Sequence, residues 1–370
     1  MRKVKPLIIG GILAASLAAA PMLASCGGDI NNDEYRDDLV VVGDGSADDG
    51  GAAAATAEKD ASDQAKEAAS EEAAPEEAAP EEAASEEAPA QDSAETADTP
   101  PEQRPIAENL AATVSGIISS YGANASVTYT SLSDLDDYAT FAVDGSEPHV
   151  SASMIKLAIM AEVFDQVNSG YLALEDSYTV QESDIVGGTG TLQGSGPGTQ
   201  LSLSDLVRHM IAESDNVATN MLIDLVGMDA VNEEVAKLGL NATSLQRYMM
   251  DTDAQAAGIE NHMSSDDAAV ILILIANGEF YTPELSQLAT DFLSQQTDAG
   301  GIAPSLSSGE TFAHKTGTLT NVRHDAGIVQ GEAPYVLSVF VEGTDEGSAL
   351  SLMGEVTTAI ETARANGEVA

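Results

Sequence analysis

The order of strand and helix patterns after residue 105 constrains the fold of this chain more than any other feature. Segments rich in Val, Thr, Tyr and Phe predict strands at 125–131, 139–143, 311–316, 326–330 and 335–342. Apolar residues at helical spacing predict helices at 105–120, 151–168, 203–212, 217–226, 229–238, 264–277, 283–295 and 347–364. Short turns between neighbouring strands favour antiparallel pairing. We therefore expect an α/β fold with one antiparallel five-stranded sheet, flanked by helices and made from both ends of this region, and an all-helical lobe inserted between them.

Residues 1–25 have the composition of an export signal. Basic residues near the start precede an apolar run, Leu7–Ala20, that is too short for a mature membrane span. The run leads to the sequence LASC at 23–26, which resembles the cleavage box of bacterial lipoproteins. We expect export, lipidation of Cys26 and anchoring to the outer face of the cell membrane, with an ordinary secretory signal as the alternative. Cys26 is the single cysteine, so no intrachain disulfide can form.

Residues 26–105 predict a disordered acidic tether rather than a folded unit. The sequence EEAAP occurs at 71–75 and 76–80 and is followed by two looser copies. Dense like charge and few aromatic residues leave too little apolar surface to offset the entropy of folding, and five residues are too few for a packed repeat. The folded domain is therefore expected over 106–370.

The folded part of the chain is strongly acidic. From residue 105 onward it has 37 Asp and Glu against seven Lys and Arg. Nucleic acid is excluded as a partner because phosphate binding needs a basic patch. The five histidines show no metal-ligand spacing, so neither a metal nor another cofactor is expected. The few cations present, among them Lys156, Lys315 and Arg323, are expected to have specific roles.

Three short motifs follow one another in the predicted domain: Ser153-Met-Ile-Lys156, Ser214-Asp-Asn216 and Lys315-Thr-Gly317. Ser153 and Lys156 are three residues apart at a predicted helix start, so they share a face near free backbone N–H groups. That setting suits a serine nucleophile and an amine that takes its proton. Each motif alone is explained more simply by a helix cap or an ordinary strand. Their joint occurrence in this order indicates an acyl-serine mechanism.

With the flanking stretches 184–193, 210–220 and 314–318, the motifs resemble the class A β-lactamase and penicillin-binding serine hydrolase superfamily over about residues 106–366. The resemblance implies an αβα sandwich with a helical lobe. It implies Ser153 as the nucleophile, Lys156 as its proton acceptor and Ser214 as a proton carrier. Lys315 would supply a positive field.

The same resemblance implies how a substrate is held. Asn216 would bind the amide of the substrate side chain, and the hydroxyls of Thr316 and Thr318 its carboxylate. Gly317 would let the strand approach closely, and the backbone N–H groups of Ser153 and Thr318 would form the oxyanion hole. Two roles remain equally open for Arg323: binding a substrate carboxylate, or pairing with one of the many acids.

One position departs from the family pattern. In class A β-lactamases the sequence Thr-x-Leu-x-Arg is followed two residues later by a glutamate that activates the hydrolytic water. Here the sequence Thr243-Ser-Leu-Gln-Arg247 is followed by Tyr248 and Met249. Methionine cannot take a proton, so acylation is better supported than turnover. Asp251 could substitute as the base, deacylation could be slow, or the natural substrate could differ from a β-lactam.

Three functions therefore remain open from the sequence. The first is a class A-like β-lactamase that opens β-lactams through an acyl-enzyme on Ser153. The second is a penicillin-binding or D-alanyl-D-alanine peptidase relative acting on cell-wall peptides, which Met249 favours. The third is a non-catalytic surface lipoprotein that binds peptidoglycan, against which the intact Ser153, Lys156, Ser214 and Lys315 argue. We expect the protein to be a monomer.

Overall fold

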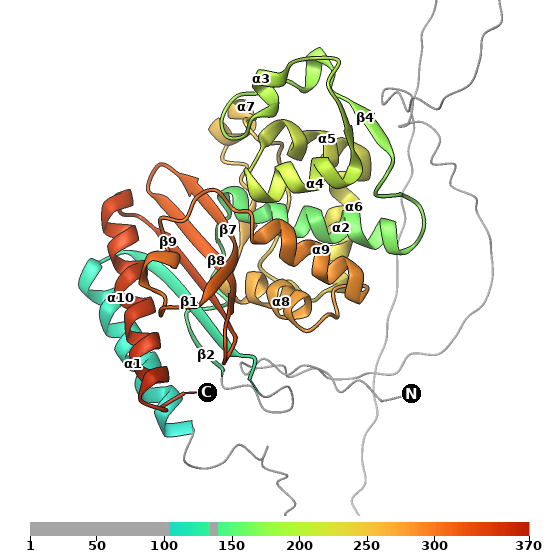
Figure 1. Cartoon of the computed structure of the whole chain (residues 1–370). Coiled ribbons are helices and arrows are strands. Elements are labelled where there is room, and N and C mark those ends of the chain that lie inside the picture. The colour runs from blue at the N-terminus through green and yellow to red at the C-terminus, as the bar shows by residue number, and fades with distance from the viewer. Residues whose placement is uncertain (1–103, 134–139, 370) are drawn as a thin grey trace, which may run out of the picture. The chain divides into compact units, whose positions relative to one another are not determined.

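A single antiparallel sheet of five strands forms the centre of the domain (Figure 1). Its strand order is β2-β1-β9-β8-β7, with bounds β1 (Asn124–Ser131), β2 (Thr140–Val143), β7 (Thr311–Leu319), β8 (Val322–Gln330) and β9 (Tyr335–Glu342). The N-terminal hairpin thus pairs with the C-terminal strand β9 rather than standing alone. This arrangement confirms the predicted five-stranded sheet made from both ends of the domain.

The computed structural model describes residues 104–133 and 140–369. The export signal over 1–25, Cys26 and nearly all of the tether over 26–105 lie outside the described residues, so those interpretations stay predictions. Among the helices that are described, none combines the length and apolar character needed to span a membrane.

Helices cover both faces of the sheet. On one face, α1 (Arg104–Tyr121) packs beside α10 (Glu346–Ala365) over the sheet (Figure 1). On the other face, α8 (Ser265–Ala276) contacts β1, β8 and β9. Ser264 caps α8 by accepting a hydrogen bond from the Asp267 N–H, and the following apolar run is almost wholly buried. The predicted αβα sandwich is confirmed, and two separate apolar clusters fill the two sides of the sheet.

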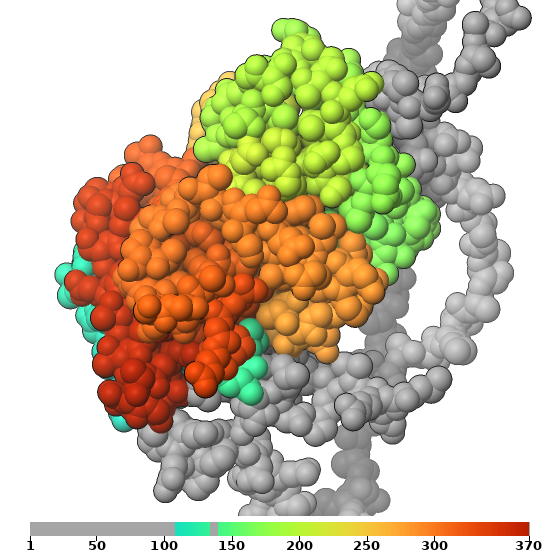
Figure 2. Space-filling model, viewed as in Figure 1, coloured from blue at the N-terminus to red at the C-terminus, as the bar shows by residue number. Residues whose placement is uncertain are grey.

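Apart from α8, the chain between β2 and β7 forms the helical lobe and its connections to the sheet. Its α-helices are α2 (Lys156–Asn168), α3 (Leu192–Ser195), α4 (Leu203–Ala212), α5 (Asn216–Val226), α6 (Met228–Lys237), α7 (Thr252–Ala256) and α9 (Pro283–Leu293). Its 3-10 turns are η1 (Ala152–Ile155), η2 (Glu182–Asp184) and η3 (Ala303–Ser305), and its two small sheets pair β3 (His149–Val150) with β6 (His262–Met263) and β4 (Ser177–Thr179) with β5 (Gln200–Ser202). Figure 2 shows the lobe in direct contact with the sheet half, with the orange segment that contains α9 across their junction in this view.

The sequence predicted two strands too short. The strand expected over 311–316 extends to Leu319. The strand expected over 326–330 begins at Val322, so β8 includes Arg323, His324 and Asp325. These charged or polar side chains do not show the pattern of a strand, yet all three are buried. Each has a partner distant in sequence: Asp298 for Arg323, Val150 for His324 and His314 for Asp325. These partners offset the cost of burying the three polar side chains, so a strand forms where composition alone argues against one.

Candidate active site

The 3-10 turn η1 presents Ser153 immediately before α2, rather than within the first turn of the α-helix as predicted. Ala152 has a left-handed backbone with a φ of 47°, and Met154 is fully buried. Gly317 of β7 lies directly against this turn. A Cβ at Gly317 would lie 3.0 Å from the Ser151 carbonyl oxygen and 3.1 Å from Met154 Cγ. Glycine is therefore needed where the strand approaches the turn.

Lys156 points its ammonium group into the interior beneath Ser214. Its Nζ donates to the Ser214 carbonyl at 2.7 Å, to Ser214 Oγ at 3.2 Å and to Asn216 Oδ1 at 2.9 Å. Complete burial lowers the pKa of Lys156 well below its ordinary value, the positive charge of Lys315 lowers it further, and Asp215 opposes this. An amine in this state is suited to accept a proton near neutral pH.

Ser214 lies on a strained turn between α4 and α5. Its φ is 53°, and its carbonyl accepts a second hydrogen bond from Thr189 Oγ1 at 2.6 Å. The Asp215 side chain accepts hydrogen bonds from the Ala218 N–H at 2.9 Å and the Leu192 N–H at 2.8 Å. The carboxylate thus caps α5 and ties it to the start of α3 at Leu192, which holds the turn that carries Ser214.

Lys315 approaches Ser214 from the sheet. Its Nζ donates to Ser214 Oγ at 3.0 Å and to the Thr316 carbonyl at 2.6 Å. Burial lowers the pKa of Lys315 to about 7. The Ser214 hydroxyl therefore lies within hydrogen-bonding distance of two lysine nitrogens, one from each side of the junction between lobe and sheet.

A cavity of about 360 Å³ opens above these groups. Of the predicted site residues, those that line it are Ser153, Ser214, Asn216, Thr316 and Thr318. Lys156 and Lys315 lie beneath Ser214 and are fully buried. The structure thus brings together residues from η1, the α4–α5 turn and β7 that the sequence separates by up to 165 positions, from Ser153 to Thr318.

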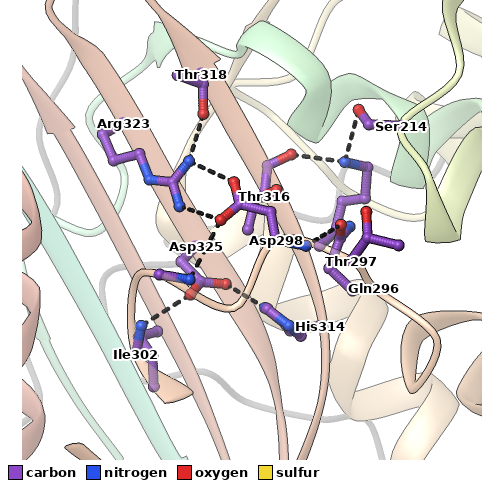
Figure 3. A network of polar contacts seen from close by, with 12 residues as sticks. Ser214, Gln296, Thr297, Asp298, Ile302, His314, Thr316, Thr318, Arg323 and Asp325 are labelled. Atoms are coloured by element: carbon purple, nitrogen blue, oxygen red, sulfur yellow. Dashed lines mark hydrogen bonds and ion pairs between the residues drawn. The ribbon is translucent and has the colours of Figure 1, made fainter. Parts of the chain in front are cut away.

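Arg323 does not line the cavity. Its Nη1 and Nη2 donate to the two carboxylate oxygens of Asp298 at 2.6 and 2.9 Å, and Nη1 also donates to Thr318 Oγ1 (Figure 3). Of the two roles left open by the sequence, the structure shows pairing with an acid. Asp298, which does line the cavity, was missed because nothing local distinguishes it from the other acids of the domain.

Met249 lines the cavity at the place where the sequence lacks the glutamate. Its side chain is nearly buried, and its main chain is held by Asn220, whose Oδ1 accepts from the Met249 N–H at 2.9 Å and whose Nδ2 donates to its carbonyl at 3.1 Å. Asp251 caps α7 by accepting from the Ala254 N–H at 2.9 Å. The structure does not bring Asp251 to the cavity wall.

Other carboxylates line the cavity but all are already paired. Their partners are Arg208 and His209 for Glu213, Arg247 for Glu260, and Arg323 for Asp298. The Arg247–Glu260 pair, at 2.7 Å, closes the base of the loop over 247–260 that carries Met249. Among the described lining residues, therefore, no carboxylate without a cationic partner faces Ser153.

Within residues 104–133 and 140–369, two groups of acidic and histidine side chains lie close enough together to hold a metal ion: His209 with Glu213 and Asp215, and Glu162 with Asp165 and Glu234. In the first group, Arg208 already contacts both His209 and Glu213. In the second, the Lys237 ammonium lies 3.0 Å from Glu234 and 3.6 Å from Asp165. Both groups already have a cationic partner, so we assign no metal to either.

The αβα sandwich with its inserted helical lobe is the fold of class A β-lactamases and penicillin-binding serine hydrolases. We call Ser153, Lys156, Ser214 and Lys315 the serine–lysine centre of this domain. The chain belongs to the Beta-lactamase enzyme family, whose model matches residues 109–363. It is 26% identical over 222 residues to a β-lactamase of Rhodobacter capsulatus, covering 56% of this chain and 74% of that protein.

Solved structures give the same classification. A β-lactamase from Sphaerobacter thermophilus is 30% identical, with a TM-score of 0.62 over 71% of this chain and 98% of its own. PBP-A is 27% identical, with a TM-score of 0.64 over 70% of this chain and 96% of its own. A variant of PBP-A has been solved as an acyl-enzyme complex with penicillin G, again with 27% identity and a TM-score of 0.64.

Proposed function

We propose that this protein is a serine hydrolase that opens β-lactams through an acyl-enzyme on Ser153 and releases the product slowly. One observation carries the proposal: the Nζ atoms of Lys156 and Lys315 lie 3.2 and 3.0 Å from the same Ser214 hydroxyl, at the wall of the cavity that contains Ser153. Burying two ammonium groups is unfavourable. A protein that only bound cell-wall material would not need this arrangement.

In the proposed acylation, Ser153 Oγ attacks the lactam carbonyl carbon. A C–O bond forms, the lactam C–N bond breaks, and the Ser153 proton passes to Lys156. A proton then reaches the departing nitrogen through Ser214 Oγ. The lowered pKa of Lys156, caused first by burial and then by Lys315, supports its role as the acceptor. Backbone N–H groups of Ser153 and Thr318 would stabilise the oxyanion.

Substrate binding would use the remaining wall of the cavity. Asn216 Nδ2 donates to the Gly187 carbonyl and Asn216 Oδ1 accepts from Lys156, so the amide is held in a fixed orientation beside Ser153. The hydroxyls of Thr316 and Thr318 offer donors for a substrate carboxylate. Lys315 adds a positive field directly beneath them.

The loop over 247–260 supports slow release. Met249 supplies no proton acceptor, and the lining carboxylates are paired with cations. Loss of a general base lowers a rate by about 10²- to 10⁴-fold. The same observation favours a second candidate, a penicillin-binding or D-alanyl-D-alanine peptidase relative acting on cell-wall peptides, whose peptidyl ester on Ser153 can be released by an amine of the cell wall as well as by water. The likeness to PBP-A is compatible with either activity.

We also propose that the protein acts outside the cell, held by a lipid at Cys26. The support is in the sequence alone: the basic and apolar start, the box at 23–26 and the acidic repeats that follow. Incorporation of labelled fatty acid into the wild-type chain but not into Cys26→Ser checks this. Equal labelling of both chains, or none, would contradict it.

A time course with a fluorescent penicillin tests the proposed function. We expect a covalent adduct on Ser153 by peptide mass spectrometry, formed quickly and lost slowly. Ser153→Ala should form no adduct, whereas Ser183→Ala, at an exposed serine outside the cavity, should behave as wild type. Absence of an adduct on the wild type would refute the acyl-serine mechanism. Release of D-alanine from a cell-wall pentapeptide, with nitrocefin left uncleaved, would favour the second candidate.

A further inference from the structure

Asp298 lies between the one buried arginine of β8 and the cavity. The Arg323 side chain is 4% exposed, whereas the Asp298 side chain is 43% exposed. Asp298 lines the cavity together with Thr316 and Thr318, and Arg323 does not. A molecule in the cavity would therefore meet the carboxylate rather than the guanidinium.

The pairing occupies the side of the guanidinium that could hold an anion. Nη1 and Nη2 each donate to one oxygen of Asp298, which is the bidentate geometry by which arginine binds a carboxylate. Nη1 also donates to the Thr318 hydroxyl, one of the groups predicted to bind the substrate carboxylate. Hydrogen bonds from Arg323 lower the pKa of Asp298 despite its partial burial, so the pair is ionised at neutral pH.

Asp298 is held in place by the helical lobe, not by the sheet that carries Arg323. The segment after α9 is fixed by the Thr297 N–H, which donates to the Ala212 carbonyl at 3.1 Å, and by Gln296 Nε2, which donates to the Ile211 carbonyl at 3.1 Å. Gln296 Oε1 then accepts from the Asp298 N–H at 3.1 Å. The carboxylate is therefore presented to Arg323 by a segment anchored to the end of α4.

We propose that Asp298 is a specificity-determining residue, an internal counter-ion that keeps a substrate carboxylate away from Arg323. This inference rests on the proposed function, because it concerns which acyl donors Ser153 accepts. Anionic substrates are then held only by Lys315, Thr316 and Thr318. An acyl donor without a charged carboxylate therefore acylates Ser153 at a rate closer to that of an anionic donor than it would if Arg323 were unpaired.

The test compares penicillin G with its methyl ester as acylating agents, followed by mass spectrometry of the whole protein. Burial lowers the pKa of Lys315 to about 7 and the charge of Asp298 partly offsets this, so removing that charge would affect Lys315 as well. The rates are therefore measured at about pH 6, where Lys315 is protonated in the wild type. The quantity that decides is the ratio of the acylation rate constants for acid and ester.

Asp298→Asn is expected to raise the acid-to-ester ratio by about tenfold, the usual gain from a charged hydrogen-bonded pair. Asp298→Ala should change the ratio in the same direction, which keeps the test decisive if one variant folds poorly. Asp298→Glu, which keeps the counter-ion, should give a ratio close to that of the wild type. Adding Arg323→Gln to Asp298→Asn should remove the gain.

Two outcomes would overturn the inference while leaving the proposed function intact. An unchanged ratio in Asp298→Asn and Asp298→Ala, with acylation of the wild type, would mean that the pair only stabilises the fold. An acid-to-ester ratio that stays raised in the Asp298→Asn, Arg323→Gln double variant would mean that Arg323 is not the group that binds the substrate carboxylate. Failure of the proposed function looks different, since the wild type would then be acylated by neither compound.

Discussion

The serine–lysine centre and the loop over 247–260 face the same cavity but differ in the charges that they present. The centre places two lysine nitrogens within about 3 Å of one buried hydroxyl, Ser214 Oγ. The loop places an apolar side chain, Met249, beside the cavity, and its own acid, Glu260, is paired with Arg247. The groups that would form an acyl-enzyme are thus assembled, whereas a group that would activate water for its hydrolysis is not.

The two regions are also held by different forces. The centre depends on burial and strain: Gly317 allows β7 to approach η1, and Ala152 and Ser214 adopt left-handed backbones. Such costs persist only where the surrounding structure enforces them. The loop also has a left-handed residue, Met250, but it is held mainly by polar contacts: hydrogen bonds between Asn220 and the Met249 main chain, and the Arg247–Glu260 pair at its base. A change in the loop should therefore alter release without altering the first chemical step, and this is what the predictions test.

The largest effect is expected at Lys156. Lys156→Met should lower the rate constant for acylation by about 10²- to 10⁴-fold, because the proton of Ser153 loses its acceptor. Stopped-flow fluorescence with a labelled penicillin measures it. Lys237→Met, which removes a lysine with a 60% exposed side chain, is the matched control and should not change the rate. A normal rate in Lys156→Met would show that another base serves the centre.

Met249→Glu should raise the rate constant for deacylation by about 10²- to 10⁴-fold by restoring a proton acceptor at the cavity wall. Acylation should stay close to wild type, which would separate the two regions. The measurement is the decay of the acyl-enzyme by mass spectrometry after excess penicillin is removed. Met249→Gln has a similar size but no proton acceptor, so it should decay as slowly as wild type. Equal rates of acyl-enzyme decay in the wild type, Met249→Glu and Met249→Gln would show that the side chain at position 249 does not limit deacylation.

The pH dependence of acylation should distinguish the two lysines. Lys315 must be charged to attract an anionic substrate, and burial lowers its pKa to about 7, so its contribution is present below that pH and lost above it. Lys156 must be neutral, so its contribution increases with pH. Their product is bell-shaped, with a falling limb of at most about tenfold per pH unit. In Lys315→Arg, which keeps its charge at high pH, the falling limb should disappear. A falling limb that persists would assign it to another group.

The smallest effect concerns the stability of the loop. Asn220→Ala leaves the buried N–H and carbonyl of Met249 without their partner and should lower the free energy of unfolding by about 1–3 kcal/mol. Urea denaturation measures the change. Asn241→Ala, at an exposed asparagine, should change stability far less. A free energy of unfolding in Asn220→Ala equal to that of the wild type would contradict the view that these two hydrogen bonds hold the loop.

Local sequence patterns predicted most of the fold. The helix over 203–212 has the predicted ends because Ser202 caps it and Glu213 begins the next turn. The strand over 335–342 was likewise predictable from its nearly continuous run of apolar, largely β-branched and aromatic residues. The short helix α7 was missed because its five residues, Thr252–Ala256, carry no apolar face. The first part of β8 was missed because buried charges there depend on partners elsewhere in the chain.

The sequence by itself determined the three motifs, their order and the absence of the usual glutamate at Met249, because these are properties of residue type and covalent spacing. Only the tertiary structure decided that Asp298 pairs with Arg323 and that Asp251 caps α7 without itself lining the cavity. Asp298 and Arg323 are 25 residues apart and lie on different parts of the fold. Among so many acids, the partner of a cation is chosen by which carboxylate the packing of lobe against sheet brings within about 3 Å, and no local pattern records that distance.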